Sequence, residues 1–140
     1  MHLLATRQPS CFTLTYLPDQ DILIGRWLRP VALEELQTHY QELLDAALAH
    51  GHCRHWLLDV RRRLINEPAA VRWFGEVFGP RLPQLLGQPV MLAYFAMVDQ
   101  HVATADPGLG ENIRQGAVQG ATYCYFDQES TAMHWLAEQP

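Results

Sequence analysis

The spacing of hydrophobic positions changes several times along the chain, and each change predicts a different element. Residues 12–17 alternate apolar and polar side chains, Pro18 to Asp21 supply turn residues, and residues 22–28 resume an apolar run. Alternation with a period of two on both sides of a short polar turn predicts a β-hairpin. We expect an exposed turn, with the strand from Phe12 forming an antiparallel edge of the sheet.

A helix and a buried strand are predicted next. After Pro30, apolar residues recur at intervals of three and four, at Leu36, Tyr40, Leu43, Leu44, Ala47 and Leu48. Acidic residues in the first turn and Gly51 just past the end complete this helical pattern. The following run, His55 to Val60, is apolar on both faces except at Asp59, which is typical of a central parallel strand.

The second half of the chain repeats the alternation of helix and strand. Pro68 begins a helix whose apolar positions are Val71, Phe74, Phe78, Leu82 and Leu85, with Pro80 and Pro83 interrupting it. Residues 90–97 are the most apolar run and predict a second central strand. Residues 106–110 indicate a loop, and residues 111–118 a short helix.

The C-terminal residues predict one more strand and helix. Residues 122–126 read as the strand, and Asp127 or Ser130 is expected to cap a final helix that presents Met133, Trp135 and Leu136. The predicted order is ββαβαβαβα, an α/β fold. One domain over residues 12–138 follows an N-terminal extension at residues 1–11.

Composition narrows the classes of function. The net charge of −5 argues against nucleic-acid binding, and all ten cationic residues are arginine, which excludes lysine Schiff-base chemistry. Three widely spaced cysteines do not form the framework of a secreted disulfide protein, so we expect a cytoplasmic protein. No apolar run is long enough for a transmembrane segment.

Several short motifs, taken in order, resemble a known family. They are Gly25-Arg26-Trp27, Leu33-Glu34-Glu35-Leu36, Leu57-Leu58-Asp59-Val60-Arg61-Arg62, Pro80-Arg81-Leu82, and Phe126-Asp127 with Trp135-Leu136. Together they look like SpoIIAA-like proteins, which are related to STAS domains, the sulfate transporter and anti-sigma antagonist class. The resemblance implies a βα superhelix in which an N-terminal antiparallel strand precedes four parallel strands. It also implies a non-enzymatic module that binds a protein partner or forms a homo-oligomer, and some members are similar to the lipid-binding SEC14 fold.

The chain departs from the STAS pattern at the helix that follows the strand ending at Val60. STAS antagonists carry a phosphorylatable Ser or Thr there, whereas residues 65–69 of this chain read Ile-Asn-Glu-Pro-Ala. Glu67 could supply a fixed negative charge in place of a phosphate. The favoured interpretation is that Glu67 stabilises the helix N-terminus, a contribution worth about 0.3 to 1 kcal/mol.

The candidate binding residues gather at this strand exit, because ligands of parallel sheets bind at the carboxyl ends of the strands. They are Asp59, Arg61, Arg62, Arg63, Asn66 and Glu67. Arginine forks suit a carboxylate or phosphate, which makes a carrier of a small anion or lipid the alternative hypothesis to the interaction module. Asp59 is equally explained by bonding the following turn or pairing with Arg61 or Arg63. The aromatic residues Trp27, Trp56, Trp73, Phe74 and Trp135 are expected in the core, although they could line a cavity.

The sequence gives little support for a catalytic site or a metal site. His50, His52, Cys53 and His55 are acceptable metal ligands, but their spacing matches no paired-ligand motif and a helix end running into a strand separates them. No activating base is evident beside Cys53 or Cys124. The sequence therefore predicts no catalytic residue, no metal and no cofactor.

Overall fold

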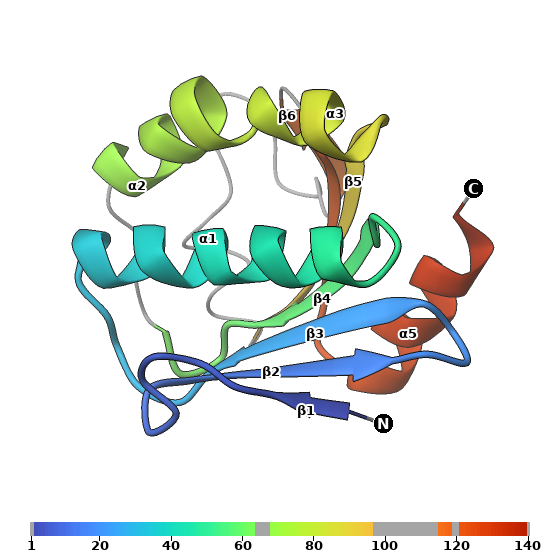
Figure 1. Ribbon diagram of the computed structural model, residues 1–140, viewed down its shortest axis with the longest axis horizontal. Helices are drawn as coiled ribbons and strands as arrows, with labels where there is room; N and C mark the ends of the chain where they lie inside the picture. Colours follow the sequence, from blue (N-terminus) through green and yellow to red (C-terminus); the bar gives the residue numbers. More distant parts are fainter. Residues whose placement is uncertain (1, 64–67, 97–114, 119–120, 140) are drawn as a thin grey trace.

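The computed structural model describes residues 2–63, 68–96, 115–118 and 121–139. A single sheet with the strand order β1-β2-β3-β4-β5-β7-β6 runs through it (Figure 1). The strands are β1 (His2–Leu4), β2 (Phe12–Leu17), β3 (Ile22–Trp27), β4 (His55–Asp59), β5 (Val90–Phe95), β6 (Gln115–Val118) and β7 (Ala121–Phe126).

The sheet combines an antiparallel beginning with a parallel centre. β1, β2 and β3 pair antiparallel, whereas β3, β4, β5 and β7 form successive parallel pairs, and β6 returns antiparallel to β7. The parallel register places Gly25 opposite Leu58, and Leu58 opposite Tyr94, which is itself opposite Tyr125. The carboxyl ends of these four strands therefore meet along one edge.

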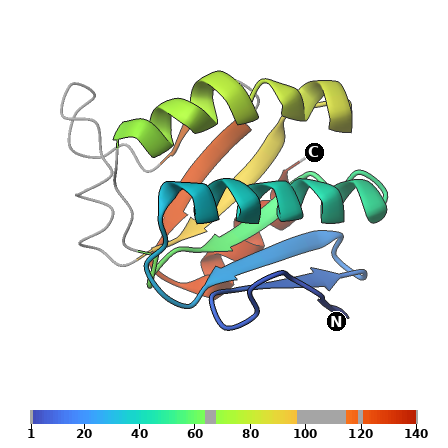
Figure 2. The same ribbon diagram turned by 60° about the vertical axis from the view of Figure 1, so that its left-hand side comes forward.

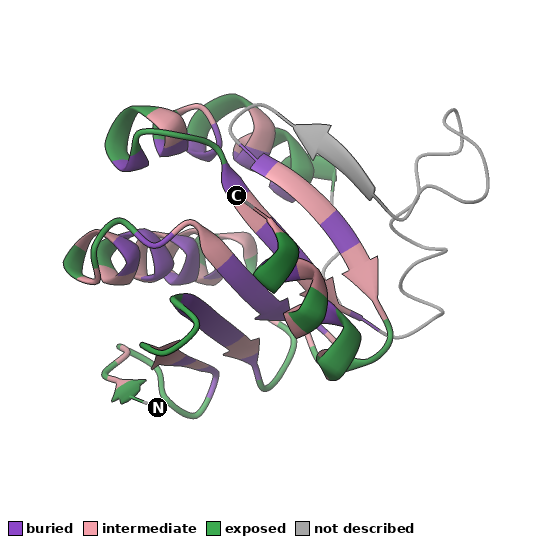
Figure 3. Ribbon diagram, turned by 90° about the vertical axis from the view of Figure 1, so that its right-hand side faces the viewer, coloured by how far each residue is buried: buried purple, intermediate pink, exposed green. Residues whose placement is uncertain are grey.

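Helices cover the two faces of the sheet unequally (Figure 2). One face carries α1 (Leu33–Ala49), α2 (Pro68–Trp73), the π-helical turn η1 (Phe74–Phe78) and α3 (Arg81–Leu86). The other face carries α5 (Glu129–Glu138), which contacts β4, β5 and β7. Figure 3 shows the exposed residues of the helices turned away from the largely buried central strands.

Alternation along the strands divides the buried side chains into two hydrophobic clusters. The larger cluster lies under α1, α2, η1 and α3 and includes Trp27, Trp56 and Leu58, all fully buried. The smaller cluster lies under α5 and includes Leu57 and Ala93. Neighbouring residues of β4 thus face opposite layers, as expected for a strand buried on both sides.

Most predicted elements are confirmed. Residues 18–21 form an exposed turn, the strand from Phe12 is antiparallel, and β4 and β5 are adjacent parallel strands with Leu57, Leu58 and Leu92 fully buried. α2 begins at Pro68, and the expected interruption occurs at Pro80, the N-cap of α3. Pro83 does not interrupt the helix as predicted, because it lies in the first turn of α3, where the missing N–H of proline costs no helical bond.

Three further predictions are wrong. The strand from Phe12 is not an edge strand, because residues 2–4 of the expected N-terminal extension pair with it as β1. Residues 115–118 are a strand rather than part of a helix, since they hydrogen-bond to β7; residues 97–114 lie outside the described residues. The N-cap of α5 is Gln128, not Asp127 or Ser130.

The helices were also compared with the dimensions of a bilayer. A membrane-spanning helix needs about 20 predominantly apolar residues. Within the described ranges, no helix combines the length and the apolar character that crossing a membrane requires.

Gly25 marks the closest approach between the sheet and α1. A Cβ atom at this position would lie 3.1 Å from two carbons of the Phe12 ring and 3.2 Å from a methyl carbon of Leu43. Both neighbours are fully buried, so each would have to shift by a few tenths of an ångström within the core. We therefore expect Gly25→Ala to lower the free energy of unfolding by about 1 to 3 kcal/mol, the usual cost of overpacking, as measured by urea denaturation.

Gly75 provides the matched control. It lies in η1, and a Cβ there would meet nothing within 4 Å. Gly75→Ala should leave stability unchanged or raise it by up to about 1 kcal/mol. Equal stability of the Gly25→Ala protein and the wild type would contradict the close packing of α1 on β3.

Candidate functional site

The exit of β4 is organised around the buried carboxylate of Asp59, whose exposed fraction is 1%. Arg61 donates to both of its oxygens, from Nε at 3.0 Å and from Nη2 at 2.9 Å, and the Arg61 backbone N–H lies 3.3 Å from Oδ1. The guanidinium also lies 4.1 Å from the ring centroid of Phe95. Two parallel bonds of this kind hold an arginine in one orientation.

A second arginine joins this cluster from the neighbouring strand. Arg26 donates from Nη1 to Asp59 at 3.1 Å and from Nη2 to Glu129 in the first turn of α5. The four side chains therefore carry two carboxylates and two guanidiniums, which balance one another. We call Arg26, Asp59, Arg61 and Glu129 the ionic cluster, and its place on the α5 face ties that helix to the strand exits.

The pKa of Asp59 reflects two opposing effects. Burial alone would raise the pKa of this carboxyl, but hydrogen bonds from Arg61 and Arg26 favour the ionised form and hold its pKa below the ordinary value. Because the folded pKa is the lower one, the carboxylate stabilises the fold above the unfolded pKa and loses that contribution as the pH falls.

The Arg63 side chain extends from the same turn toward the opposite face of the sheet, the α1 face. Its guanidinium carbon lies 4.7 Å from the ring centroid of Trp27 and 6.0 Å from that of Tyr40, and Nη1 donates to the Tyr40 hydroxyl at 3.2 Å. The Nε atom is buried and has no hydrogen-bond partner in the part of the chain that the structure describes. No carboxylate of the described residues forms an ion pair with Arg63.

The hydroxyl groups beside Arg63 add another donor. The Tyr40 and Tyr94 hydroxyl oxygens lie 3.4 Å apart, so one hydroxyl donates to the other across a long hydrogen bond. That bond uses one of the pair's two O–H donors, and Arg63 cannot accept the second, since a guanidinium only donates. Burial raises the pKa of Tyr94 well above its usual value and keeps that hydroxyl protonated. Among the described residues, donors thus outnumber acceptors around Arg63.

The structure therefore separates the predicted site residues. Asp59 and Arg61 lie together in the ionic cluster, Arg63 lies on the other face of the sheet, and Arg62 is exposed between them. Asn66 and Glu67 lie outside the described residues. Among the aromatic residues, Trp27 and Trp56 are fully buried, whereas Trp73 and Trp135 are only partly buried.

One polar group that the sequence did not single out lies inside the larger cluster. His39 of α1 accepts a hydrogen bond on Nδ1 from the Trp27 indole N–H at 2.9 Å, which places the ring proton on Nε2, 3.2 Å from the Gln8 side-chain oxygen. The Cys11 sulfur lies 4.0 Å from the same Nε2. A protonated nitrogen cannot take a proton from the thiol, and burial raises the pKa of Cys11, so this pair does not form an activated nucleophile.

The histidines and cysteine around residue 53 have local roles. His50 donates from Nδ1 to the Ala46 carbonyl at 2.8 Å, and Cys53 donates to the Asp21 carbonyl at 3.2 Å. Burial raises the pKa of Cys53 to about 12, so its sulfur is a thiol at neutral pH. Within the described ranges, no three His, Cys, Asp or Glu side chains gather as metal ligands.

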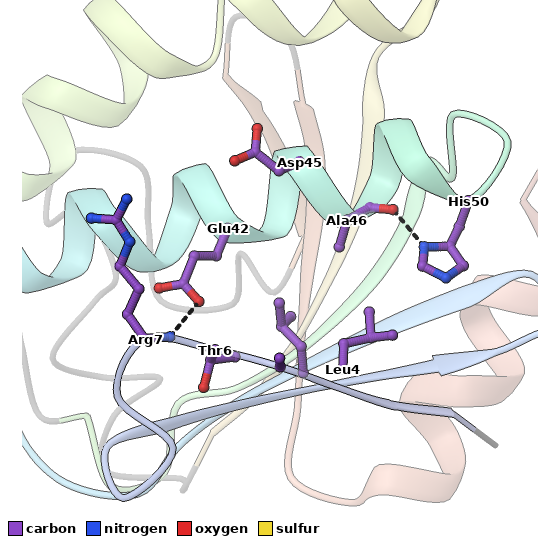
Figure 4. Close-up of a pocket in the computed structure, with 9 residues that line it drawn as sticks. Leu4, Thr6, Arg7, Glu42, Asp45, Ala46 and His50 are labelled. Carbon is purple, nitrogen blue, oxygen red and sulfur yellow. Dashed lines mark hydrogen bonds between the residues drawn. The ribbon is translucent and has the colours of Figure 1, made fainter.

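A separate hollow of about 520 Å³ lies between β1 and α1 (Figure 4). Glu42 and His50 reach into it from α1, opposite Leu4 and Thr6. One Glu42 oxygen accepts the Arg7 backbone N–H at 3.2 Å, and the other is buried without a partner. Burial raises the pKa of this carboxyl. The hollow shares no residue with the ionic cluster.

The chain matches no protein-family model, no curated protein and no solved structure. Its function must therefore be inferred from the strand-exit geometry. That geometry contains, on one face, an arginine whose Nε has no acceptor among the described residues, and on the other face a neutralised ionic cluster.

Removing the buried charge should destabilise the fold. Asp59→Asn keeps the shape of the side chain but removes the acceptor charge shared by Arg26 and Arg61. We expect the free energy of unfolding to fall by about 1.5 to 3 kcal/mol, the range for hydrogen bonds to charged groups. Glu129→Gln is the matched control in the same cluster: its side chain is 43% exposed, and we expect a loss below about 1 kcal/mol. Similar losses in both variants, measured by chemical denaturation at pH 7, would refute the central role of Asp59.

The buried imidazole predicts sensitivity to acid. Burial lowers the pKa of His39 to about 4, below its ordinary value of 6.5. As the pH falls, His39 therefore binds a proton in the unfolded chain before it does so in the native state. The free energy of unfolding decreases by about 2 kcal/mol between pH 7 and pH 5 as a result. His39→Asn retains an acceptor for Trp27 but does not titrate, so the difference in stability between wild type and variant should shrink by that amount over this interval. A constant difference would contradict the prediction.

Proposed function

We propose that the protein is a non-enzymatic binding protein whose ligand is a small anion held by Arg63 at the carboxyl edge of the parallel strands. The observation that carries this proposal is the surplus of donors at Arg63. Among the described residues, its guanidinium has no carboxylate partner, its buried Nε has no hydrogen-bond acceptor, and one O–H of the neighbouring tyrosine pair has no acceptor either. A carboxylate or phosphate offers the missing acceptors in a geometry that matches an arginine fork.

The position of Arg63 supports the same proposal. In open parallel sheets, ligands bind outside the carboxyl ends of the strands, and Arg63 follows β4 at that edge. Its positive charge lies against aromatic rings, which leave it less hydrated than a surface arginine and strengthen its attraction for an anion.

The relationship to STAS domains also remains a proposal. An antiparallel strand, β2, followed by the four mutually parallel strands β3, β4, β5 and β7 supports it, as does the placement of α1, α2 and α3 on one face. A cytoplasmic location is likewise a proposal, and it is supported by three buried cysteines that form no disulfide among the described residues. A role for Glu67 as a fixed phosphate mimic has no support from the described residues.

A protein-interaction module is the second candidate. It is supported by the apolar side chains that α2, η1 and α3 expose, with Val71 at 67%, Val77 at 53% and Leu85 at 40% exposure. Such residues favour contact with a protein partner or a second copy of the chain. Anion binding is preferred because buried unbonded donors carry a larger energetic penalty than isolated exposed apolar side chains.

Isothermal titration calorimetry with acetate, benzoate, inorganic phosphate and phenyl phosphate tests the preferred function. We expect at least one of these anions to bind the wild type. Arg63→Met should weaken that binding by about 10-fold to 150-fold, which corresponds to losing charge-assisted hydrogen bonds. Arg62→Met is the matched control, since it removes the same charge from an exposed neighbour and should change affinity little.

Two outcomes would contradict the preferred function. Either no anion binds the wild type, or Arg62→Met and Arg63→Met weaken binding equally, which would indicate general charge attraction. Native mass spectrometry of the same samples addresses the second candidate. Oligomers that persist in Arg63→Met without any bound anion would favour the interaction module.

A further inference from the structure

We infer that the ligand at Arg63 is an aromatic acid, in which a planar ring carries the carboxylate or phosphate group. This inference rests on the proposed function, because it assigns the acid group to Arg63. The further observation is the set of aromatic side chains that extends from Arg63 across the α1 face of the sheet. They are Trp27, Tyr40, Tyr94, Tyr123 and Tyr125.

The sheet register creates this row. Trp27 ends β3, Tyr94 lies near the end of β5, and Tyr125 is its direct partner on β7. All three side chains belong to the face of the larger cluster, so the carboxyl ends of three parallel strands present aromatic rings on one side. β4 contributes Leu58 and Val60 to this face instead, and the guanidinium of Arg63 lies over the rings of the adjoining β3 and α1.

Arg63 and Tyr94 are linked through a single side chain. The guanidinium donates to the Tyr40 hydroxyl at 3.2 Å, and the Tyr94 hydroxyl lies 3.4 Å from that oxygen. An acid group bonded to the guanidinium would therefore have its attached ring close to Tyr94. The unused O–H of the tyrosine pair lies at the same place and could donate to the acid oxygen or to a polar substituent of the ring.

The tyrosine rings are arranged as aromatic ligands require. Tyr94 stacks on Tyr125 with ring centroids 5.0 Å apart, and Tyr123 meets Tyr94 edge-on at 6.3 Å. Tyr94 and Tyr123 are only partly buried, whereas Leu58 and Leu92 on the same face are fully buried. Another ring can add to such a group by stacking or edge contact, whereas an aliphatic body gains only burial.

Matched pairs of ligands test the inference. Benzoate and cyclohexanecarboxylate share a charge and a similar size but differ in aromaticity. We expect the wild type to bind benzoate about threefold to tenfold more tightly, the range that corresponds to aromatic pairing beyond burial. Titration calorimetry gives both affinities, and phenyl phosphate against inorganic phosphate identifies the preferred acid group.

Variants of Tyr94 test whether its ring causes the preference for benzoate over cyclohexanecarboxylate. Tyr94→Phe keeps the ring and should keep the preference for benzoate, whereas Tyr94→Leu should bind both carboxylates with equal affinity. Tyr123→Leu supplies a second test of the aromatic row if Tyr94→Leu fails to fold, as judged by circular dichroism, and should reduce the same preference. Retention of the full preference in every folded leucine variant would overturn the role of the rings.

Failure of this inference is distinguishable from failure of the proposed function. If the wild type binds benzoate and cyclohexanecarboxylate equally, and Arg63→Met weakens both, the ligand is an anion without a required ring and the inference is wrong. If neither carboxylate and neither phosphate compound gives a heat of binding that Arg63→Met reduces, the anion-binding function itself is wrong.

Discussion

The fork of Arg61 on Asp59 is the interaction on which the strand exit depends. A carboxylate as buried as Asp59 has to be paired, and one bidentate partner together with Arg26 satisfies it. The fork holds the Arg61 side chain on the α5 face and so determines the direction of the turn at residues 61–63. Arg63, two residues later, leaves on the α1 face, among rings rather than acids. The neutralised cluster and the arginine that has no carboxylate partner among the described residues thus arise from the same four-residue exit.

Much of the fold could be predicted from local pattern. The hairpin, α1, β4, β5 and β7 each have either a clear period or a continuous apolar run bounded by turn residues, and these signals are local. β1 escaped prediction because it has three residues, with two of its side chains exposed, and owes its conformation to pairing with β2. Residues 115–118 were misassigned for the same reason, since their pairing partner β7 is supplied by the fold.

The site was predictable only in outline. Three consecutive arginines after an apolar strand indicate charge at a strand exit, but their separate environments depend on partners far away in the sequence. Arg26 comes from the neighbouring strand and Tyr40 from α1, and neither stands out in the sequence except as a charged residue in an apolar strand and an aromatic residue at a core position. The hydrogen bond between Trp27 and His39 could not be predicted from the sequence either, because it depends on how α1 packs on β3.

The two ends of the sheet constrain how copies of this protein can meet. A strand edge with unpaired backbone groups is a template for adding a strand from another molecule, and long exposed edges are therefore hazardous. Here the outermost strands, β1 and β6, have only three and four residues. Among the described residues, each end therefore offers only a short ladder for intermolecular β-addition. Contact between copies is favoured at the exposed helix surfaces rather than at the sheet edges.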